Sequence, residues 1–436
     1  MIKQIVVLGF LFILSGCSSI GLPPLNDPLR FQPDTNKKSL YQAKQAGNNI
    51  KKSDDLTLIL TFSGGGTRAA AFSYGVMKEL ESIKNGHGAR QTSLLDEVDL
   101  ISSVSGGSFT SAYYGLYGKR IFSDFERLFL KRPVQSSLIK YLLFSPSNWI
   151  KLAPALYERS DLAADYYADT IFGKKRYRDM RRNGPRIVIN ATDLASGRGF
   201  SFTKNSFKRL CSNISSYPVG RAVVASSAVP VVFSPIVMKN YSGQCEVETS
   251  VAPLKTGRRY QSFLHLVDGG VVDNLGIRSL INLVEENDND FWTLMKTHKM
   301  TKNHKVVFIV VNASDAIPPT IGSNRRSPGT STTLGAVTTI QSRRYNRETL
   351  SLLRSRFPIW EASVRKGRCA ETKSSRCAEI KFQMTELNFN QLSAKQANEL
   401  SLLETSLELP DDKVDQLIEA GRQLLRQSSV IKQIAR

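Results

Sequence analysis

A serine in a turn of small residues is the first candidate for chemistry. Ser105 follows the apolar run 98–101 and precedes Gly106-Gly107-Ser108, and helical spacing begins near Phe109. A sharp strand-to-helix turn holds one hydroxyl above its surroundings, and it needs small neighbours because its strained backbone passes close to other strands. Ser105 is therefore a candidate nucleophile.

Two glycine-containing loops could supply the other groups that such a nucleophile needs. Gly64-Gly65-Gly66 follows the predicted buried strand Leu56–Phe62 and opens a helix, so its backbone N–H groups could hold a developing oxyanion. Asp268 follows the predicted strand 263–267 and precedes two glycines, so it could approach a serine closely. The three loops together offer the nucleophile, base and anion hole that acyl transfer requires.

These motifs resemble those of the patatin-like phospholipases, which are related to the cytosolic phospholipase A group. The resemblance rests on Gly64-Gly65-Gly66-x-Arg68, the Ser105 turn, Asp268-Gly269-Gly270 and the block 225–230. It implies a phospholipase A or lysophospholipase type of hydrolase that cleaves acyl esters with a Ser–Asp dyad and no triad histidine. Ser105 would be the nucleophile, Asp268 the base, and Gly64, Gly65 and Gly66 the oxyanion hole, with Arg68 adding positive potential. The resemblance implies no metal and no organic cofactor.

The same residues allow a second class of function. Ser103 and Ala69 stand where the family usually has glycine, two residues before the nucleophile and directly after the arginine. A chain that kept the fold but lost turnover would be a surface lipoprotein that binds lipid or a partner. Retention of Ser105, Asp268 and the three glycines favours the enzyme.

Two narrower alternatives also concern these loops. Gly64-x-Gly66-x-x-Ala69 fits a loose dinucleotide-binding pattern, but that pattern explains neither Ser105 nor Asp268. His265 could complete a Ser-His-Asp triad. However, side chains alternate along a strand, so His265 and Asp268 are expected on opposite faces, and a structural histidine is favoured.

Buried apolar runs alternate with amphipathic segments along the chain and must position these loops. This alternation predicts an α/β fold with a central, mostly parallel sheet flanked by helices. We expect a catalytic domain over residues 56–312 and a helical C-terminal extension over 313–436 that packs on it. Strands are expected over residues 56–62, 98–101, 186–192, 263–267, 305–312 and 379–387, and helices over 69–85, 109–117, 221–228, 275–286, 333–356 and 411–425.

Two further features have more than one interpretation. Residues 121–157 are rich in aromatic and basic side chains, which is typical of a lid that admits lipid or, slightly favoured, of helices packed on the sheet. Asp193 follows a predicted strand, where it could touch the site but more often fixes a turn.

The N-terminus indicates export and lipid anchoring. Residues 1–16 contain Lys3 and a short apolar stretch, as a signal peptide does. Leu14-Ser15-Gly16-Cys17 resembles a bacterial lipobox, in which Cys17 would carry the lipid. Ser18 in place of aspartate favours outer-membrane over inner-membrane sorting, and residues 17–55 are predicted to be a flexible tether.

Charge and cysteine content agree with that location. The formal net charge is +21, which favours attraction to anionic membranes, and no nucleic-acid-binding signature accompanies it. Cys211, Cys245, Cys369 and Cys377 suggest disulfides in an exported protein. Their proximity in sequence favours Cys369–Cys377 and Cys211–Cys245, although three pairings are open. The spacing contains no C-x-x-C pair, so a zinc site is not expected.

Overall fold

The computed structural model describes residues 26–29, 55–85, 92–144, 158–229, 233–244, 255–256, 259–317, 320–323, 325–372 and 375–435. The predicted signal peptide, Cys17 and most of the predicted tether lie outside these residues, so the statements about them stay predictions. Within the described part of the chain, no helix combines the length and the apolar character needed to cross a membrane.

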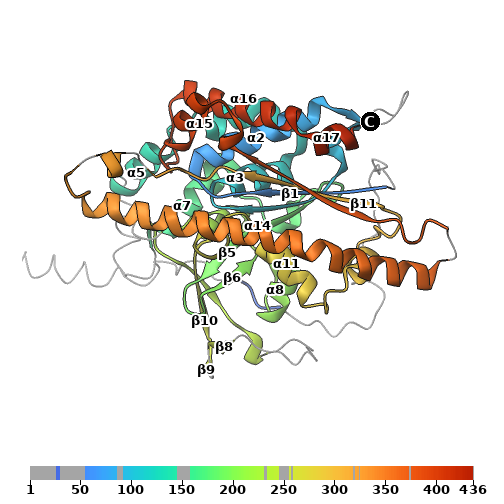
Figure 1. Ribbon diagram of the computed structural model, residues 1–436. Helices are drawn as coiled ribbons and strands as arrows, with labels where there is room; N and C mark the ends of the chain where they lie inside the picture. The colour runs from blue at the N-terminus through green and yellow to red at the C-terminus, as the bar shows by residue number, and fades with distance from the viewer. Residues whose placement is uncertain are drawn as a thin grey trace, which may run out of the picture.

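A mostly parallel sheet forms the centre of the molecule (Figure 1). Within the described residues it has eight strands, in the order β12-β11-β1-β4-β5-β10-β7, and β6 pairs with β5. The first five strands of this order run parallel, whereas β10, β7 and β6 pair antiparallel. The predicted fold class is confirmed. The strands are β1 (Leu56–Phe62), β4 (Val98–Val104), β5 (Arg186–Asp193), β6 (Arg198–Ser201), β7 (Ile236–Lys239), β10 (Phe263–Asp268), β11 (Lys305–Asn312) and β12 (Lys381–Asn388).

Helices cover both faces of the sheet, which explains why β1 is mostly apolar and is buried along its whole length. Leu58, Leu60 and Phe62 of β1 face one core together with three helices, α2 (Gly66–Ser82), α3 (Gly106–Tyr117) and α16 (Asp411–Gln427). Ile59 faces a second core with α11 (Arg278–Glu285), α12 (Phe291–Thr297) and α14 (Thr330–Glu371). Figure 1 shows α2 and α16 on one side of the sheet and α14 and α11 on the other.

Shorter elements connect these layers. They are β2 (Lys84–Asn85), β3 (Thr92–Ser93), α4 (Ile121–Phe125), α5 (Val134–Phe144), α7 (Arg159–Tyr167), α8 (Lys204–Arg209), α9 (Val219–Ser226), β8 (Lys255–Thr256), β9 (Arg259–Tyr260), α10 (Gly270–Asp273), α13 (Thr320–Ser323), α15 (Ala394–Ser401) and α17 (Ser429–Ile434). The predicted elements occur in the expected order, with ends that differ by a few residues except in α14.

The aromatic segment that was a candidate lid packs against the core over its described part. Phe125, Phe129 and Leu138 are buried, and the ring of Phe129 stacks on that of Phe109 with 4.2 Å between centroids. The packing interpretation therefore holds for residues 121–138. Residues 145–157 of this segment lie outside the described part.

Helix α14 continues 15 residues beyond its predicted end at Arg356 and contains Pro358. Proline removes one backbone hydrogen bond and usually ends or bends a helix. Here Pro358 lies on the exposed side of α14, whereas Leu353 and Trp360 on either side of it are fully buried in the second core. This packing keeps the helix continuous through the proline.

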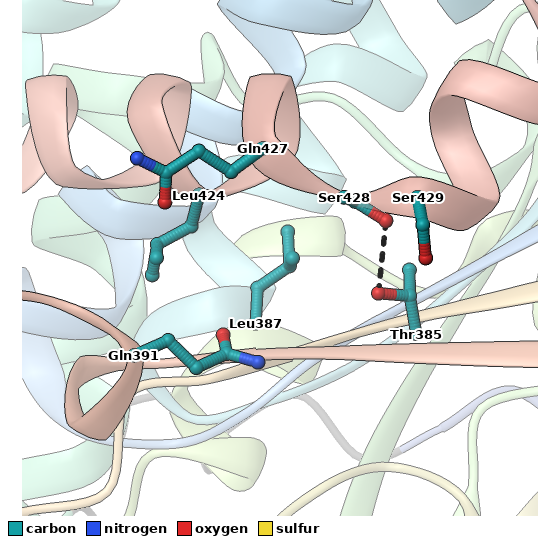
Figure 2. Close-up of a pocket in the computed structure, with 7 residues that line it drawn as sticks. All are labelled: Thr385, Leu387, Gln391, Leu424, Gln427, Ser428 and Ser429. Atoms are coloured by element: carbon teal, nitrogen blue, oxygen red, sulfur yellow. Dashed lines mark hydrogen bonds between the residues drawn. The ribbon is translucent and has the colours of Figure 1, made fainter.

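The C-terminal extension joins the central sheet directly, because β12 pairs with β11 along its whole length. The buried side chains Val414, Leu417 and Leu425 form the predicted apolar face of α16, which packs on α2. A hollow of about 270 Å³ lies between β12 and the last helices. The hydroxyls of Thr385 and Ser428 lie 3.1 Å apart there and form a hydrogen bond (Figure 2). None of the predicted site residues lines this hollow.

The predicted disulfide between Cys369 and Cys377 is confirmed. Cys211 is also disulfide-bonded, and its partner lies outside the described residues. The predicted pairing of Cys211 with Cys245 therefore stays a prediction.

Candidate active site

Ser105 occupies the sharp turn between β4 and α3. Its backbone has φ 49° and ψ −121°, a conformation that is strained for a residue with a side chain. The neighbouring glycines are required, since a Cβ on Gly106 would lie 2.0 Å from the carbonyl oxygen of Gly66 and one on Gly107 would lie 2.7 Å from Phe62 Cβ. Ser105 is 5% exposed, and the turn holds its hydroxyl in place as the sequence predicts.

Ser103 is accommodated without distorting this turn. Its hydroxyl lies 2.6 Å from that of Ser111, accepts a hydrogen bond from Ser108 at 3.2 Å, and lies 3.3 Å from the carbonyl oxygen of Val188. A buried hydroxyl is tolerated when its hydrogen bonds are made. The departure from glycine therefore adds polar contacts beneath the turn.

Asp268 ends β10 and lies beside Ser105. Its carboxylate accepts a hydrogen bond from the N–H of Gly270 at 2.7 Å. Burial raises the pKa of Asp268 to about 6, and the Gly270 N–H and the nearby Ser105 hydroxyl act in the opposite direction. The sequence-predicted nucleophile and base are thus brought close together.

The three glycines of the loop after β1 have different roles. The N–H of Gly64 donates to the carbonyl oxygen of Asn274 at 3.0 Å, and a Cβ on Gly64 would lie 3.2 Å from Ser105 Cβ. Gly65 and Gly66 have φ values of +130° and +57°, which favour glycine. No described residue accepts a hydrogen bond from their N–H groups. These two N–H groups, rather than that of Gly64, remain available for an oxyanion.

Arg68 anchors the glycine loop to other parts of the chain. Its buried guanidinium donates to the carbonyl oxygens of Ala313 (2.9 Å) and Leu403, and to the hydroxyl of Thr405 at 3.2 Å. Asp315 lies 4.0 Å away. These contacts identify a structural role, in addition to the positive potential that the sequence suggested.

The family model of the patatin-like phospholipases matches residues 60–281, which is half of the chain. The chain belongs to the patatin-like phospholipase family. The match includes the glycine loop, Ser105 and Asp268.

Comparisons with solved structures return chains of low sequence identity. Human GIVD cytosolic phospholipase A2 is 12% identical with a TM-score of 0.47, and the alignment covers 88% of this chain and 60% of that chain. VipD from Legionella pneumophila is 11% identical with a TM-score of 0.32, with 89% and 71% covered. The chain spans about three-fifths of the length of the human protein. No curated protein sequence matches it.

Ser226 supports the nucleophile turn of this patatin-like chain in a way that the sequence did not predict. Its hydroxyl accepts from the Ser105 N–H at 2.9 Å, donates to the carbonyl oxygen of Asn190 at 2.6 Å, and lies 3.0 Å from the Ser108 hydroxyl. The block 225–230 marked this segment as part of the family pattern. However, a serine near a helix end gives no local sign of a partner 121 residues away.

His265 and Asp193 lie where the favoured interpretations placed them. His265 is exposed, whereas Leu264, Leu266 and Asp268 of the same strand are buried, so His265 points away from the dyad of this patatin-like chain. The Asp193 carboxylate accepts hydrogen bonds from the N–H and hydroxyl of Ser196 and therefore fixes a turn.

A cavity of about 760 Å³ lies beside the site, against Asn190, Gly269 and Asp273. Neither Ser105 nor Asp268 lines it. Burial also raises the pKa of Asp273 to about 6, although backbone N–H groups at residues 275–278 oppose the shift. Among the described residues of this family member, no group of three or more His, Cys, Asp or Glu side chains could hold a metal ion.

Proposed function

We propose that this protein is a serine acyl hydrolase that cleaves phospholipids, of the phospholipase A or lysophospholipase type. The observation that carries the proposal is the position of the Ser105 hydroxyl beside the buried Asp268 carboxylate, close enough to act on the pKa of that group. Membership of the patatin-like phospholipase family supports a lipid acyl hydrolase in general. The Ser–Asp dyad and the phospholipid substrate are the finer parts of the proposal.

In the first half of the reaction, Ser105 Oγ attacks the acyl carbonyl carbon while its proton passes to Asp268. The carbonyl oxygen becomes an oxyanion, and the N–H groups of Gly65 and Gly66 are available to bind it. One such donor is worth about 3 kcal/mol of transition-state stabilisation. The tetrahedral intermediate then expels the alcohol part of the lipid, which takes the proton from Asp268, and an acyl-enzyme is left on Ser105.

The second half repeats these steps with water. Asp268 removes a proton from a water molecule as the water oxygen attacks the carbonyl carbon of the acyl-enzyme. The same N–H groups bind the second oxyanion. Collapse releases the fatty acid and returns the proton to Ser105 Oγ. The pKa of about 6 suits this role, because Asp268 is a carboxylate at neutral pH yet basic enough to accept a proton.

Covalent labelling with a fluorophosphonate probe tests the proposal. We expect the full-length protein to be labelled and Ser105→Ala to be unlabelled. Ser227→Ala is a matched control, because the Ser227 hydroxyl donates to the carbonyl oxygen of Val223 in its own helix. Mass spectrometry of mixed phospholipids incubated with each protein should show free fatty acid and lysolipid only where labelling occurs. Lack of Ser105-dependent labelling would favour the binding lipoprotein instead.

We also propose that Cys17 carries a lipid that anchors the protein to a bacterial membrane, with the outer membrane favoured by Ser18. The net charge of +21 supports additional attraction to anionic lipid. Radiolabelled palmitate should be incorporated into the wild-type protein and not into Cys17→Ala. Fractionation of the two membranes then tests the sorting.

A further inference from the structure

The amino-terminal half of α14 carries an exposed apolar stripe that the proposed chemistry does not use. Leu334, Val337 and Ile340 are 63%, 44% and 42% exposed. Side chains three residues apart lie on neighbouring positions of a helix surface, so these three share one face. Residues 334–344 span about 15 Å of helix.

Contacts on the opposite side of the helix fix the direction in which this stripe points. The hydroxyl of Thr339 donates to Asp315 at 3.3 Å, and the side-chain amide of Asn346 donates to Ser314 at 2.9 Å. At 100° per residue, Thr339 and Asn346 lie roughly opposite Val337, which is the middle residue of the stripe. The apolar stripe therefore faces away from the protein body.

The charge around the stripe is mostly positive, although the exposed Glu348 follows on the same helix face. Residues 325–347 contain five arginines and no lysine, aspartate or glutamate. Arg344 and Arg347 follow Ile340 by four and seven residues, so they continue the same helix face, and both are exposed. We call Leu334, Val337, Ile340, Arg344 and Arg347 the α14 face.

The α14 face is tied to the loop that holds the candidate oxyanion site. Ser314 and Asp315, which α14 contacts, follow Ala313. The N–H of Ala313 donates to Ser63 at 2.9 Å and its carbonyl accepts from Arg68, on both sides of the glycine loop. In Figure 1 the amino-terminal end of α14 projects at the left of the view, on the same side as α5.

We propose that the α14 face docks on an anionic lipid bilayer and thereby presents the site to its substrate. Leu334, Val337 and Ile340 enter the interface, and Arg344 and Arg347 contact lipid phosphates. A second copy of this chain is a poorer occupant, because two such faces would bring together more arginines than acidic side chains. The inference deepens the proposed function and rests on it for the nature of the substrate.

Hydrogen–deuterium exchange on the full-length Ser105→Ala protein tests the docking without any turnover. The probes are vesicles of phosphatidylcholine with 30% phosphatidylglycerol and vesicles of phosphatidylcholine alone. We expect slower exchange over residues 330–347 with the anionic vesicles, and unchanged exchange over 352–364. Equal exchange with and without anionic vesicles would overturn the proposal. Slow exchange without lipid, together with a dimer in sedimentation, would assign the face to a second copy.

Two sets of substitutions then connect docking to catalysis. The triple variant Leu334→Gln, Val337→Gln and Ile340→Gln should lower the rate of hydrolysis in anionic vesicles on the order of tenfold or more, because the burial of apolar surface in the interface is lost. The double variant Arg344→Gln and Arg347→Gln should lower this rate about 30-fold, on the order of fivefold per arginine. Hydrolysis of a water-soluble short-chain ester should stay within twofold. Ile359→Gln with Arg354→Gln, on the other half of the same helix, is the matched control and should change neither rate. An equal fall in vesicle and ester hydrolysis by the triple or the double variant would contradict docking. Absence of ester hydrolysis by the wild-type protein would contradict only the proposed function.

Discussion

The hydroxyl of Ser226 accepts a hydrogen bond from the backbone N–H of Ser105 at 2.9 Å and so holds the strained turn from beneath. Ser105 lies between the end of β4 and the start of α3, and its buried N–H bonds to this side chain. The Ser226 hydroxyl in turn donates a hydrogen bond to the carbonyl oxygen of Asn190, so the turn is fixed to β5 through one side chain.

Replacing Ser226 by alanine tests whether this contact positions the nucleophile. It leaves the buried N–H of Ser105 without its partner and removes a hydrogen bond to the carbonyl of Asn190, so the free energy of unfolding should fall by about 1–3 kcal/mol. We expect kcat to fall roughly tenfold with little change in KM, because the hydroxyl and not the substrate site is displaced. Ser227→Ala is the control. Unchanged kcat in Ser226→Ala would mean that the turn does not need this support.

The pH dependence of ester hydrolysis should report the ionisation of Asp268. In the proposed mechanism the carboxylate of Asp268 accepts the Ser105 proton, so kcat/KM should rise with pH around a midpoint near the pKa of about 6 and then level off. Steady-state rates with a non-ionisable short-chain ester between pH 4.5 and 8 measure this. Asp273 has a similarly raised pKa of about 6, but Asp273→Asn should keep the midpoint. If Asp273→Asn lost the midpoint, the ionisation that controls kcat/KM would belong to Asp273 and not to Asp268.

Asp268→Asn should remove activity and stabilise the fold at neutral pH. The pKa of Asp268 is raised from 3.8 to about 6 in the folded protein, so the folded state binds the proton more tightly than the unfolded state. Stability is therefore lost as pH rises from about 4 to 6, and the full cost persists above pH 6. An asparagine avoids this cost, which corresponds to at most about 3 kcal/mol.

Chemical unfolding at pH 4.5 and pH 8 measures this difference. The Asp268→Asn variant should exceed wild type clearly at pH 8 and only slightly at pH 4.5. Asp290→Asn is a control, because it should change the free energy of unfolding at pH 8 in the opposite direction. Burial acts to raise the pKa of Asp290, but hydrogen bonds from Thr293 and Ser363 hold it below its usual value, so its loss should lower stability at pH 8. A wild-type protein as stable as Asp268→Asn at pH 8 would contradict the raised pKa.

Gly66→Ala should damage the candidate oxyanion loop. Its Cβ would lie 2.2 Å from the carbonyl oxygen of Ser406, and φ +57° is itself unfavourable for alanine by about 1–2 kcal/mol. We expect kcat to fall at least tenfold and thermal stability to decrease. Gly335→Ala meets no atom within 4 Å inside α14 and should be neutral or stabilising by about 0.5–1 kcal/mol. Equal activity of the Gly66→Ala and Gly335→Ala variants would mean that catalysis does not depend on the conformation of the glycine loop.

The sequence was most informative where structure is determined locally. The turn at Ser105 and the buried strand Lys305–Asn312 follow from runs of small or apolar residues, and the structure has them as predicted. The Cys369–Cys377 disulfide closes a short loop. The face of α16 follows from its helical period.

Interactions between distant segments could not be predicted from the sequence. The pairing of Ser226 with Ser105, the engagement of the Gly64 N–H by Asn274 and the contact of Arg68 with Leu403 each depend on tertiary packing. The continuation of α14 through Pro358 is another example, since the local signal favours a helix end and the buried Trp360 outweighs it. Local pattern determines which elements form, whereas packing determines which polar groups meet.

The bond from the Thr67 N–H to the carbonyl oxygen of Ser406, 2.8 Å long, means that the glycine loop is completed by residues translated much later. At 5–20 residues per second, a ribosome needs roughly 20–70 s to proceed from one to the other. A nascent chain that already contains Ser105 and Asp268 would still lack the segment that seats Gly66. Under the proposed function, partly synthesised chains should therefore be inactive towards the lipids of the cell that makes them.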